Sequence, residues 1–335
     1  MKYDICSLGN AIVDITFQIG TEFQQKLISK GISPSSMTLI DQKEQHELLD
    51  DLNANFKKES FMACGGSATN SIIAASNFGS HCYYSCKVAD DEFGNFYLQD
   101  LLKNAISHNS TPLRSSLSSG KCIVMVTPDA ERTMCTNLGI SGELSTQDIN
   151  EEAIINSRYL YLEGYLVTSE KAFKAAIKSA NIAKENNVKI ALSLSDPNIV
   201  SIFRDNFLEI LDIKCDLIFC NELEAMAFSK KDDLKKSIEV LREFSLEGLI
   251  TLGSKGCIAW SQSQSLKLST SKVNALDTNG AGDMFAGAVL NGLTEGKNLT
   301  ESAKFGCFAA SEKVKSFGPR VDGPKYKKIK KDFYS

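Results

Sequence analysis

The stretch DTNGAGDMFAG, residues 277–287, lies between an extended run and an apolar helix and is the most informative segment of this sequence. The small residues Gly280, Ala281 and Gly282 let several backbone N–H groups point into one cavity at the helix N-terminus, where the helix dipole favours an anion. Asp283 follows in the first helical turn. There its carboxylate can accept a proton from a hydroxyl while the neighbouring amides hold a phosphoryl group. Taken alone, the stretch is equally compatible with an ordinary glycine-rich turn before a helix.

Length, composition and charge exclude several classes of protein. The 335 residues are enough for one large α/β domain or two ordinary ones. The net charge of -4 argues against nucleic acid as the main partner. No stretch approaches the roughly 18–20 apolar residues that span a bilayer, and the N-terminus MKYDICSLGN lacks the layout of a signal peptide. We therefore expect a cytoplasmic protein with neither nucleic acid nor membrane as a partner.

The cysteines and histidines do not form a recognisable reactive set. Ten cysteines are scattered along the chain without a CxxC pair, and Cys82 and Cys86 lack a second pair that would complete a zinc site. Reduced and mostly buried thiols are the expected state. The three histidines, His46, His81 and His108, lie outside any motif. This pattern argues against a Ser-His-Asp or Cys-His mechanism.

Strand and helix patterns alternate in the second half of the chain. The residues 120–137 predict a β-hairpin around a Pro-Asp turn. After about residue 157, the short apolar runs YLYLEGYL, KIALSLS, CDLIFC and GLITLG are separated by helical patterns, which indicates a parallel sheet with helices on its faces. The predicted helices cover 169–186, 198–211 and 222–244, and two more begin near 282 and 299, the last with Asn298 and Glu301 as a cap.

Five motifs in one order resemble the ribokinase family of carbohydrate and nucleoside kinases, also called the PfkB family. DTNGAGDMFAG resembles its C-terminal signature and CGGSATN, residues 64–70, its N-terminal di-glycine signature. The others are Gly9-Asn10 with Asp14, NELE at 221–224 and TLGSKG at 251–256. The resemblance implies one kinase domain over residues 1–335. Its fold would be a three-layer α/β sandwich with a mostly parallel central sheet. A small β-lid would be built from about 10–20, 34–41 and 113–137.

The first motifs supply candidates for binding the phosphoryl acceptor. Asn10, Asp14 and Asn70 carry short polar side chains that can bond vicinal hydroxyls, and Gly65 and Gly66 let the backbone approach a sugar ring. An ordinary turn before a helix would also explain the two glycines. The resemblance implies that these residues hold the hydroxyl-bearing part of the substrate.

The later motifs supply candidates for binding ATP. An Asn followed three residues later by Glu is a capping box after a strand, whereas the resemblance places Asn221 and Glu224 near the phosphates, with Glu224 reaching Mg²⁺ indirectly. TLGSKG is either a plain turn between strands or a floor for the ATP base and ribose, and no P-loop spacing occurs in the chain. The nucleotide-side candidates are Asn221, Glu224, Thr251, Gly253, Gly256 and, in the turn LSDP, Ser195.

Catalysis is expected from the helix start and from one arginine. The resemblance implies that Asp283 takes the proton of a primary hydroxyl while the backbone at Gly280, Ala281 and Gly282 holds the transferred group. Arg132, in the predicted hairpin, corresponds to a lid arginine that neutralises phosphate charge, a role suited to a planar guanidinium. A solvated strand-end arginine is the simpler alternative.

The acceptor is expected to be a ribonucleoside, with adenosine first and purine salvage as the setting. GNAIVDI, GGSATN, LSDP and DTNGAGD look closer to adenosine kinases and their bacterial relatives than to fructokinases. Where those kinases present a Phe-Phe pair, this chain has Gly164-Tyr165-Leu166, so inosine, guanosine, ribose and a ketohexose remain open. Apolar candidates for a base pocket are Ile12, Met37, Leu39, Met134, Tyr165 and Leu166.

Other properties follow from weaker patterns. Asp277 and Asn279, with residues 314–319, resemble a loop pair that binds K⁺ in some relatives, so K⁺ joins ATP and Mg²⁺ as an expected ligand. A monomer or homodimer is expected. The basic tail KYKKIKKDFYS is expected to be a solvated helix end. No GxGxxG follows the first strand, so a dinucleotide-binding dehydrogenase is a distant third alternative without support from a motif. A weakly catalytic binding protein on the same fold remains the other class.

Overall fold

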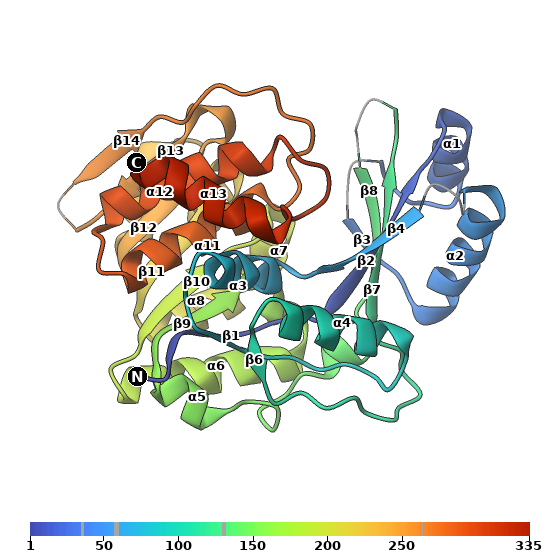
Figure 1. Cartoon of the computed structure of the whole chain (residues 1–335), viewed down its shortest axis with the longest axis horizontal. Helices are drawn as coiled ribbons and strands as arrows, with labels where there is room; N and C mark the ends of the chain where they lie inside the picture. The colour runs from blue at the N-terminus through green and yellow to red at the C-terminus, as the bar shows by residue number, and fades with distance from the viewer. Residues whose placement is uncertain (35–36, 57–59, 129–131, 263) are drawn as a thin grey trace.

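Two sheets of different size organise the chain (Figure 1). The computed structural model describes residues 1–34, 37–56, 60–128, 132–262 and 264–335. Within these residues, a nine-stranded sheet forms the larger body and a five-stranded sheet lies at one side of it. None of the helices in the described residues is both long and apolar enough to cross a membrane.

The large sheet is parallel except at one edge. From β6 through β12 all neighbouring strands pair in parallel, whereas β13 and β14 add an antiparallel edge. Its strands, in sheet order, are β14 (Ser265–Leu268), β13 (Cys257–Trp260), β12 (Ser245–Thr251), β11 (Cys215–Asn221), β10 (Lys189–Ser193), β9 (Ser157–Glu163), β1 (Tyr3–Leu8), β5 (Cys82–Ser85) and β6 (Ser107–His108).

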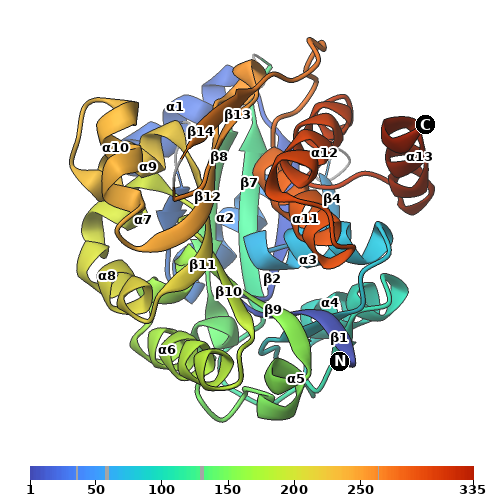
Figure 2. The same cartoon turned by 90° about the vertical axis from the view of Figure 1, so that its left-hand side faces the viewer.

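Helices cover both faces of the large sheet, which confirms the expected three-layer sandwich (Figure 2). One layer contains α5 (Glu151–Ile155), α6 (Glu170–Glu185), α7 (Pro197–Ile202), α8 (Arg204–Asp212), α9 (Glu222–Ser229) and α10 (Leu234–Leu241). The other contains α3 (Ser67–Asn77), α4 (Glu92–Lys103), α11 (Ala281–Thr294), α12 (Leu299–Lys313) and α13 (Gly323–Tyr334). Short 3₁₀ turns occupy Gly139–Glu143 (η2), Gly164–Thr168 (η3) and Gly253–Lys255 (η4).

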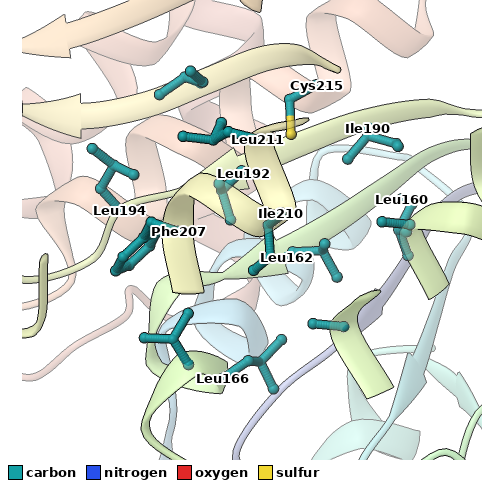
Figure 3. Packing of buried hydrophobic residues seen from close by; sticks show 14 of the residues in the cluster. Leu160, Leu162, Leu166, Ile190, Leu192, Leu194, Phe207, Ile210, Leu211 and Cys215 are labelled. Atoms are coloured by element: carbon teal, nitrogen blue, oxygen red, sulfur yellow. The ribbon is translucent and has the colours of Figure 1, made fainter. Parts of the chain in front are cut away.

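The strand β9 shows why its sequence forms a central strand. Successive side chains of a strand point to opposite faces. Leu160 and Leu162 therefore pack with α6 and α8, in the cluster of Figure 3. Tyr159 and Tyr161 pack into the cluster on the opposite face. A strand covered on both faces needs a continuous apolar run rather than an alternating one, and this requirement explains YLYL.

The small sheet collects segments that are distant in sequence. Its order is β3 (Met37–Leu39), β8 (Arg132–Asn137), β7 (Gly120–Val126), β2 (Ile12–Gln18) and β4 (Ser60–Gly65). Helices α1 (Thr21–Ser29) and α2 (Gln42–Phe56) pack against one face through an apolar cluster. The antiparallel pairing of β7 with β8 confirms the predicted hairpin. Each segment predicted for a lid contributes a strand here, although residues 35–36 and 129–131 within those segments lie outside the described residues.

Three helical predictions differ from the structure. The predicted helix 198–211 is two helices with Phe203 between them, and 222–244 is also two. Lys230 adopts the left-handed conformation at the end of α9 (φ 54°), and the Asp233 side chain accepts a hydrogen bond from Lys236 N to begin α10. The basic tail forms α13, which buries Tyr326 and Ile329 and is therefore a packed helix rather than only a solvated end.

The close approach of α11 to α3 yields a test of the packing. A Cβ atom at Gly287 would lie 2.3 Å from the carbonyl oxygen of Ser71. We expect Gly287→Ala to lower the free energy of unfolding by about 1–3 kcal/mol, because the helices must separate to admit the methyl group. Urea unfolding measures this change. The control is Gly282→Ala on the same helix, where an added Cβ meets nothing within 4 Å; equal losses in both variants would contradict the packing argument.

Candidate active site

The N-terminus of α11 is left open to a ligand. Its N-cap residue, Gly280, has φ 70°, and a Cβ there would lie 2.0 Å from the carbonyl oxygen of Pro319, so only glycine fits. Among the described residues no side chain caps this helix. Gly282 faces open space. Ala281 N donates to the carbonyl oxygen of Thr278 at 3.2 Å, whereas Gly282 N and Asp283 N have no hydrogen-bond acceptor among the described residues and could hold an anion.

Asp283 is held by two side chains from α3. Its Oδ1 accepts a hydrogen bond from the Ser67 hydroxyl at 2.7 Å, and its Oδ2 accepts one from Asn70 Nδ2 at 3.0 Å. Burial raises the pKa of Asp283 to about 6, while these two bonds and the Lys313 ammonium act in the opposite direction. A carboxylate with a pKa near neutrality is suited to take a proton and release it again. Ser67 lies inside the di-glycine signature CGGSATN, but the motif by itself predicted no role for this hydroxyl.

Two cavities meet at this helix start. The inter-sheet cavity, about 410 Å³, lies between the two sheets and contains Asp283 and the polar residues of the first motifs. The edge cavity, about 250 Å³, lies between the loop after β12 and the helices α11 and α12. Thr278, Ala281 and Gly282 line both. A larger surface hollow beside α6, about 840 Å³, contains none of the predicted site residues.

The glycine pair fits tightly around the polar end of the inter-sheet cavity. A Cβ on Gly65 would lie 2.5 Å from the Asp14 carboxylate oxygens, and one on Gly66 would lie 2.4 Å from the Asn10 carbonyl oxygen. Gly66 also has φ 90°, which L side chains rarely adopt. Both glycines are therefore required by the neighbouring atoms. Asn70 Oδ1 is buried and has no hydrogen-bond partner among the described residues.

Glu163, at the end of β9, is a site residue that the sequence analysis missed. Its carboxylate accepts hydrogen bonds from the backbone N–H groups of Asn10 and Ala68, each at 2.7 Å, and so ties the first turn to the start of α3. Burial raises the pKa of Glu163 to about 7 despite these bonds. An acidic residue at the carboxyl end of an otherwise apolar strand was the available signal, because ligands bind at that edge of parallel sheets.

Most of the predicted apolar candidates line the inter-sheet cavity, and one does not. Ile12, Met37, Leu39, Met134 and Tyr165 contribute to its wall. The prediction for Leu166 is wrong in placement. The 3₁₀ turn η3 directs this side chain into the core, where it is fully buried in the cluster of Figure 3.

The nucleotide-side candidates separate into two groups. Thr251, Gly253 and Gly256 line the edge cavity together. Asn221, Glu224 and Ser195 line the inter-sheet cavity, and a small cavity of about 100 Å³ is lined by these three residues together with Thr251. The Ser195 hydroxyl accepts a hydrogen bond from Gly164 N at 2.9 Å.

The NELE segment forms the capping box that its spacing predicted. Asn221 Oδ1 accepts from Glu224 N at 2.8 Å, and Glu224 Oε2 accepts from Asn221 N at 2.9 Å. Burial raises the pKa of Glu224 to about 7, although the bond from Asn221 N acts against it. Within the described residues no group of three or more His, Cys, Asp or Glu side chains could hold a metal ion.

Arg132 reaches from the small sheet to the loop before α11. Its guanidinium pairs with Asp277, whose side chain is 1% exposed. Asp277 Oδ1 also accepts from Asn279 N at 2.7 Å, and Oδ2 accepts from Gly318 N at 2.8 Å. The predicted lid arginine thus lies beside the loop that leads into α11, paired with a carboxylate of the large body.

The raised pKa of Asp283 predicts that the difference in stability between Asp283→Asn and the unsubstituted protein depends on pH. An exposed Asp has a pKa of about 4. The stabilising contribution of Asp283 is therefore present below that value and is lost as the pH rises through about 6. Asp283→Asn removes this loss, and Asn70 can turn its amide so that Oδ1 accepts from the new side chain. We expect the melting temperature of Asp283→Asn, relative to the unsubstituted protein, to increase between about pH 5 and about pH 8.

The control for this measurement is Asp91→Asn. Burial pushes the pKa of Asp91 upward, but hydrogen bonds from Ser119 and Gly94 outweigh it and lower that pKa. Asp91 is therefore ionised throughout the range, and its melting-temperature difference should stay constant from about pH 5 to about pH 8. A constant difference for Asp283→Asn as well would contradict the raised pKa.

Comparison with known proteins places this geometry in a family. The family described as "pfkB family carbohydrate kinase" matches residues 24–325. Mouse ribokinase is 30% identical over 281 residues, which cover 81% of this chain and 84% of that protein. The structure of adenosine kinase from Sinorhizobium meliloti has a TM-score of 0.89 at 31% identity, covering 98% of this chain and 99% of its own. That of a probable sugar kinase from Rhizobium etli CFN 42 has a TM-score of 0.91 at 28% identity, covering 99% and 98%. The predicted resemblance is thereby confirmed, and the chain is a kinase that belongs to the pfkB family.

Proposed function

We propose that this kinase transfers the terminal phosphoryl group of ATP to the primary hydroxyl of a ribonucleoside, with adenosine as the first candidate. One observation carries the proposal. Two cavities meet at Thr278, Ala281 and Gly282, and the Asp283 carboxylate lies on the inter-sheet side of that junction. A donor in the edge cavity and an acceptor in the inter-sheet cavity would meet at the open N-terminus of α11.

The lining of the inter-sheet cavity supports a nucleoside as the acceptor. One part is polar, with Asn10, Asp14 and Asn70, and the Asn70 Oδ1 atom, which has no partner within the described part of the chain, could accept from a hydroxyl. Another part is apolar and contains Ile12, Met37, Leu39 and Met134. A ribose would satisfy the polar groups while a flat base would cover the apolar wall.

In the proposed reaction, Asp283 takes the proton of the acceptor hydroxyl as that oxygen attacks the phosphoryl group. The first-turn N–H groups of α11 stabilise the negative charge that develops on the transferred group. Arg132 supplies a further positive charge from the small sheet. Holding acceptor and donor in line accounts for most of the rate enhancement in phosphoryl transfer.

Mg²⁺ would neutralise charge on the ATP phosphates when bound. Both Glu224 oxygens are already bonded to Asn221, through its backbone N–H and through Nδ2 at 2.6 Å. This arrangement fits an indirect role for Glu224, through the water shell of the ion, as the resemblance implied. The small sheet would act as a lid that excludes water from the reacting groups. Whether the kinase is a monomer or a homodimer stays a prediction.

A sugar kinase is the second candidate, and the 30% identity to mouse ribokinase favours it. A free pentose would occupy the polar part of the inter-sheet cavity. It would leave the apolar wall at Met37 and Met134 without a partner, and for this reason we place it second.

Loss of the proposed base should slow the chemical step. Asp283→Asn keeps the side-chain volume but removes the proton acceptor, so we expect kcat to fall by about 10²–10⁴. Steady-state ADP release measures the change. Asp212→Asn, an exposed carboxylate on α8, is the control and should retain full turnover. Unchanged turnover in Asp283→Asn would remove Asp283 from the mechanism.

An acceptor panel tests the substrate assignment. With ATP and Mg²⁺, we expect kcat/KM to be higher for adenosine than for inosine, guanosine, ribose and fructose. Met134→Ser should lower kcat/KM for adenosine by about tenfold, because the base loses apolar contact, and should leave ribose unaffected. Higher kcat/KM for ribose or fructose than for every nucleoside would instead establish the sugar kinase.

A further inference from the structure

Lys313, the last residue of α12, is a fully buried lysine close to the catalytic loop. Lysine is almost never fully buried unless it is paired. No motif pointed to this residue, and the proposed reaction assigns it no role. Its position behind the N-terminus of α11 therefore requires an explanation.

The Lys313 ammonium bonds to the residue that begins the catalytic loop. Its Nζ donates to the carbonyl oxygen of Asp277 at 2.9 Å and lies 4.0 Å from Asp277 Oδ1. Leu276 N and Asp277 N donate to the carbonyl oxygen of Val314, the residue after Lys313, at 2.7 and 3.1 Å. The end of α12 and the start of the loop are thus joined by two backbone hydrogen bonds and by one hydrogen bond from the buried Lys313 ammonium.

The residues at Asp277 do not fit the monovalent cation that the sequence suggested. K⁺ is bound by several oxygen atoms, often backbone carbonyls, that replace its hydration shell. Here the Asp277 carbonyl already accepts from Lys313 Nζ, and its carboxylate accepts from Asn279 N and Gly318 N and pairs with Arg132. A cation at these oxygens would displace existing donors and lie against the ammonium, which like-charge repulsion disfavours.

We propose that the Lys313 ammonium takes the place of a monovalent cation in this kinase, as a covalently attached positive charge that positions the loop 277–280, so that activity does not require K⁺. The proposal rests on the proposed phosphoryl transfer at the start of α11. Lys313 is a positioning residue, since it acts through Asp277 and not on the substrate.

The charge of Lys313 also acts at longer range. It adds positive potential behind the N–H groups that would hold the transferred phosphoryl group, in the same direction as the helix dipole. It is also one of the groups that lower the pKa of Asp283 against the effect of burial. A side chain of the same shape without the charge would retain the packing of α12 but lose both effects.

Three variants distinguish the effect of the Lys313 charge from the effect of its side-chain packing. Lys313→Ala opens a space beside the freed Asp277 carbonyl that a small cation can enter. Lys313→Met fills that space with an apolar chain. Lys313→Gln keeps a neutral N–H₂ donor group without the charge. Activity is measured in about 0.1 M KCl and in tetramethylammonium chloride of equal ionic strength, whose cation is too large to bind.

We expect the unsubstituted kinase to turn over equally in both salts. In tetramethylammonium chloride, kcat of all three variants should fall by about 10- to 100-fold, with a smaller change in KM for the acceptor. KCl should restore most of the lost kcat in Lys313→Ala and none in Lys313→Met. Severalfold activation of the unsubstituted kinase by KCl, or full activity of Lys313→Gln, would overturn the proposal.

Thermal melting without substrates gives a reading that does not depend on activity. KCl should raise the melting temperature of Lys313→Ala above its value in tetramethylammonium chloride, and should not do so for Lys313→Met or the unsubstituted kinase. An equal response of all proteins would overturn the replacement of a cation by Lys313. If the acceptor panel fails, this comparison still stands, so failure of the proposed function and failure of this inference are distinguishable.

Discussion

The close packing of α3 against α11 is the constraint on which the site depends. Gly287 lets the backbone of α11 approach the Ser71 carbonyl of α3, and no other residue type has room there. This contact brings Ser67 and Asn70 within hydrogen-bond distance of Asp283, more than two hundred residues away in sequence. Gly287, the last glycine of the motif 277–287, is therefore needed for the packing of α11 on α3. The first two, Gly280 and Gly282, keep the N-terminus of α11 free of side chains. The two signatures of the family lie side by side because these helices touch.

The site concentrates carboxylates whose ionised forms are costly to bury. Burial raises the pKa of Asp14, Glu163 and Glu224 to about 7 and that of Asp283 to about 6. The fold tolerates this cluster because both faces of the central sheet are packed with apolar side chains. Burying carboxylates lowers the stability of a fold. Such a loss of stability is expected at a binding site, where polar groups must face a ligand. The hydroxyls of an acceptor would add donors for the Asp14 and Asp283 carboxylates, which face the inter-sheet cavity.

The sequence predicted those parts of the structure that carry a local pattern. Strand runs, the hairpin, both capping boxes and the glycine-rich turns each have a periodicity or spacing, and the structure contains them. Glu163 and Lys313 could not be found in this way, because a single charge in an apolar segment acquires its role from partners distant in sequence. Leu166 was misplaced for a related reason. The direction of a side chain in a 3₁₀ turn depends on the backbone and not on the residue type.

Asp277 has two cationic partners from different parts of the molecule, and this arrangement bears on how the small sheet can move. Arg132 comes from the small sheet and Lys313 from the large body. A buried carboxylate that loses its only cation is strongly destabilised. If Arg132 were the only cation beside Asp277, movement of its guanidinium toward a phosphate would leave the Asp277 carboxylate buried without a cationic partner. Because Lys313 remains in place, we infer that Arg132 can exchange Asp277 for a phosphoryl group at little cost. The fixed ammonium would then hold the loop before α11 steady during the step in which the arginine changes partner.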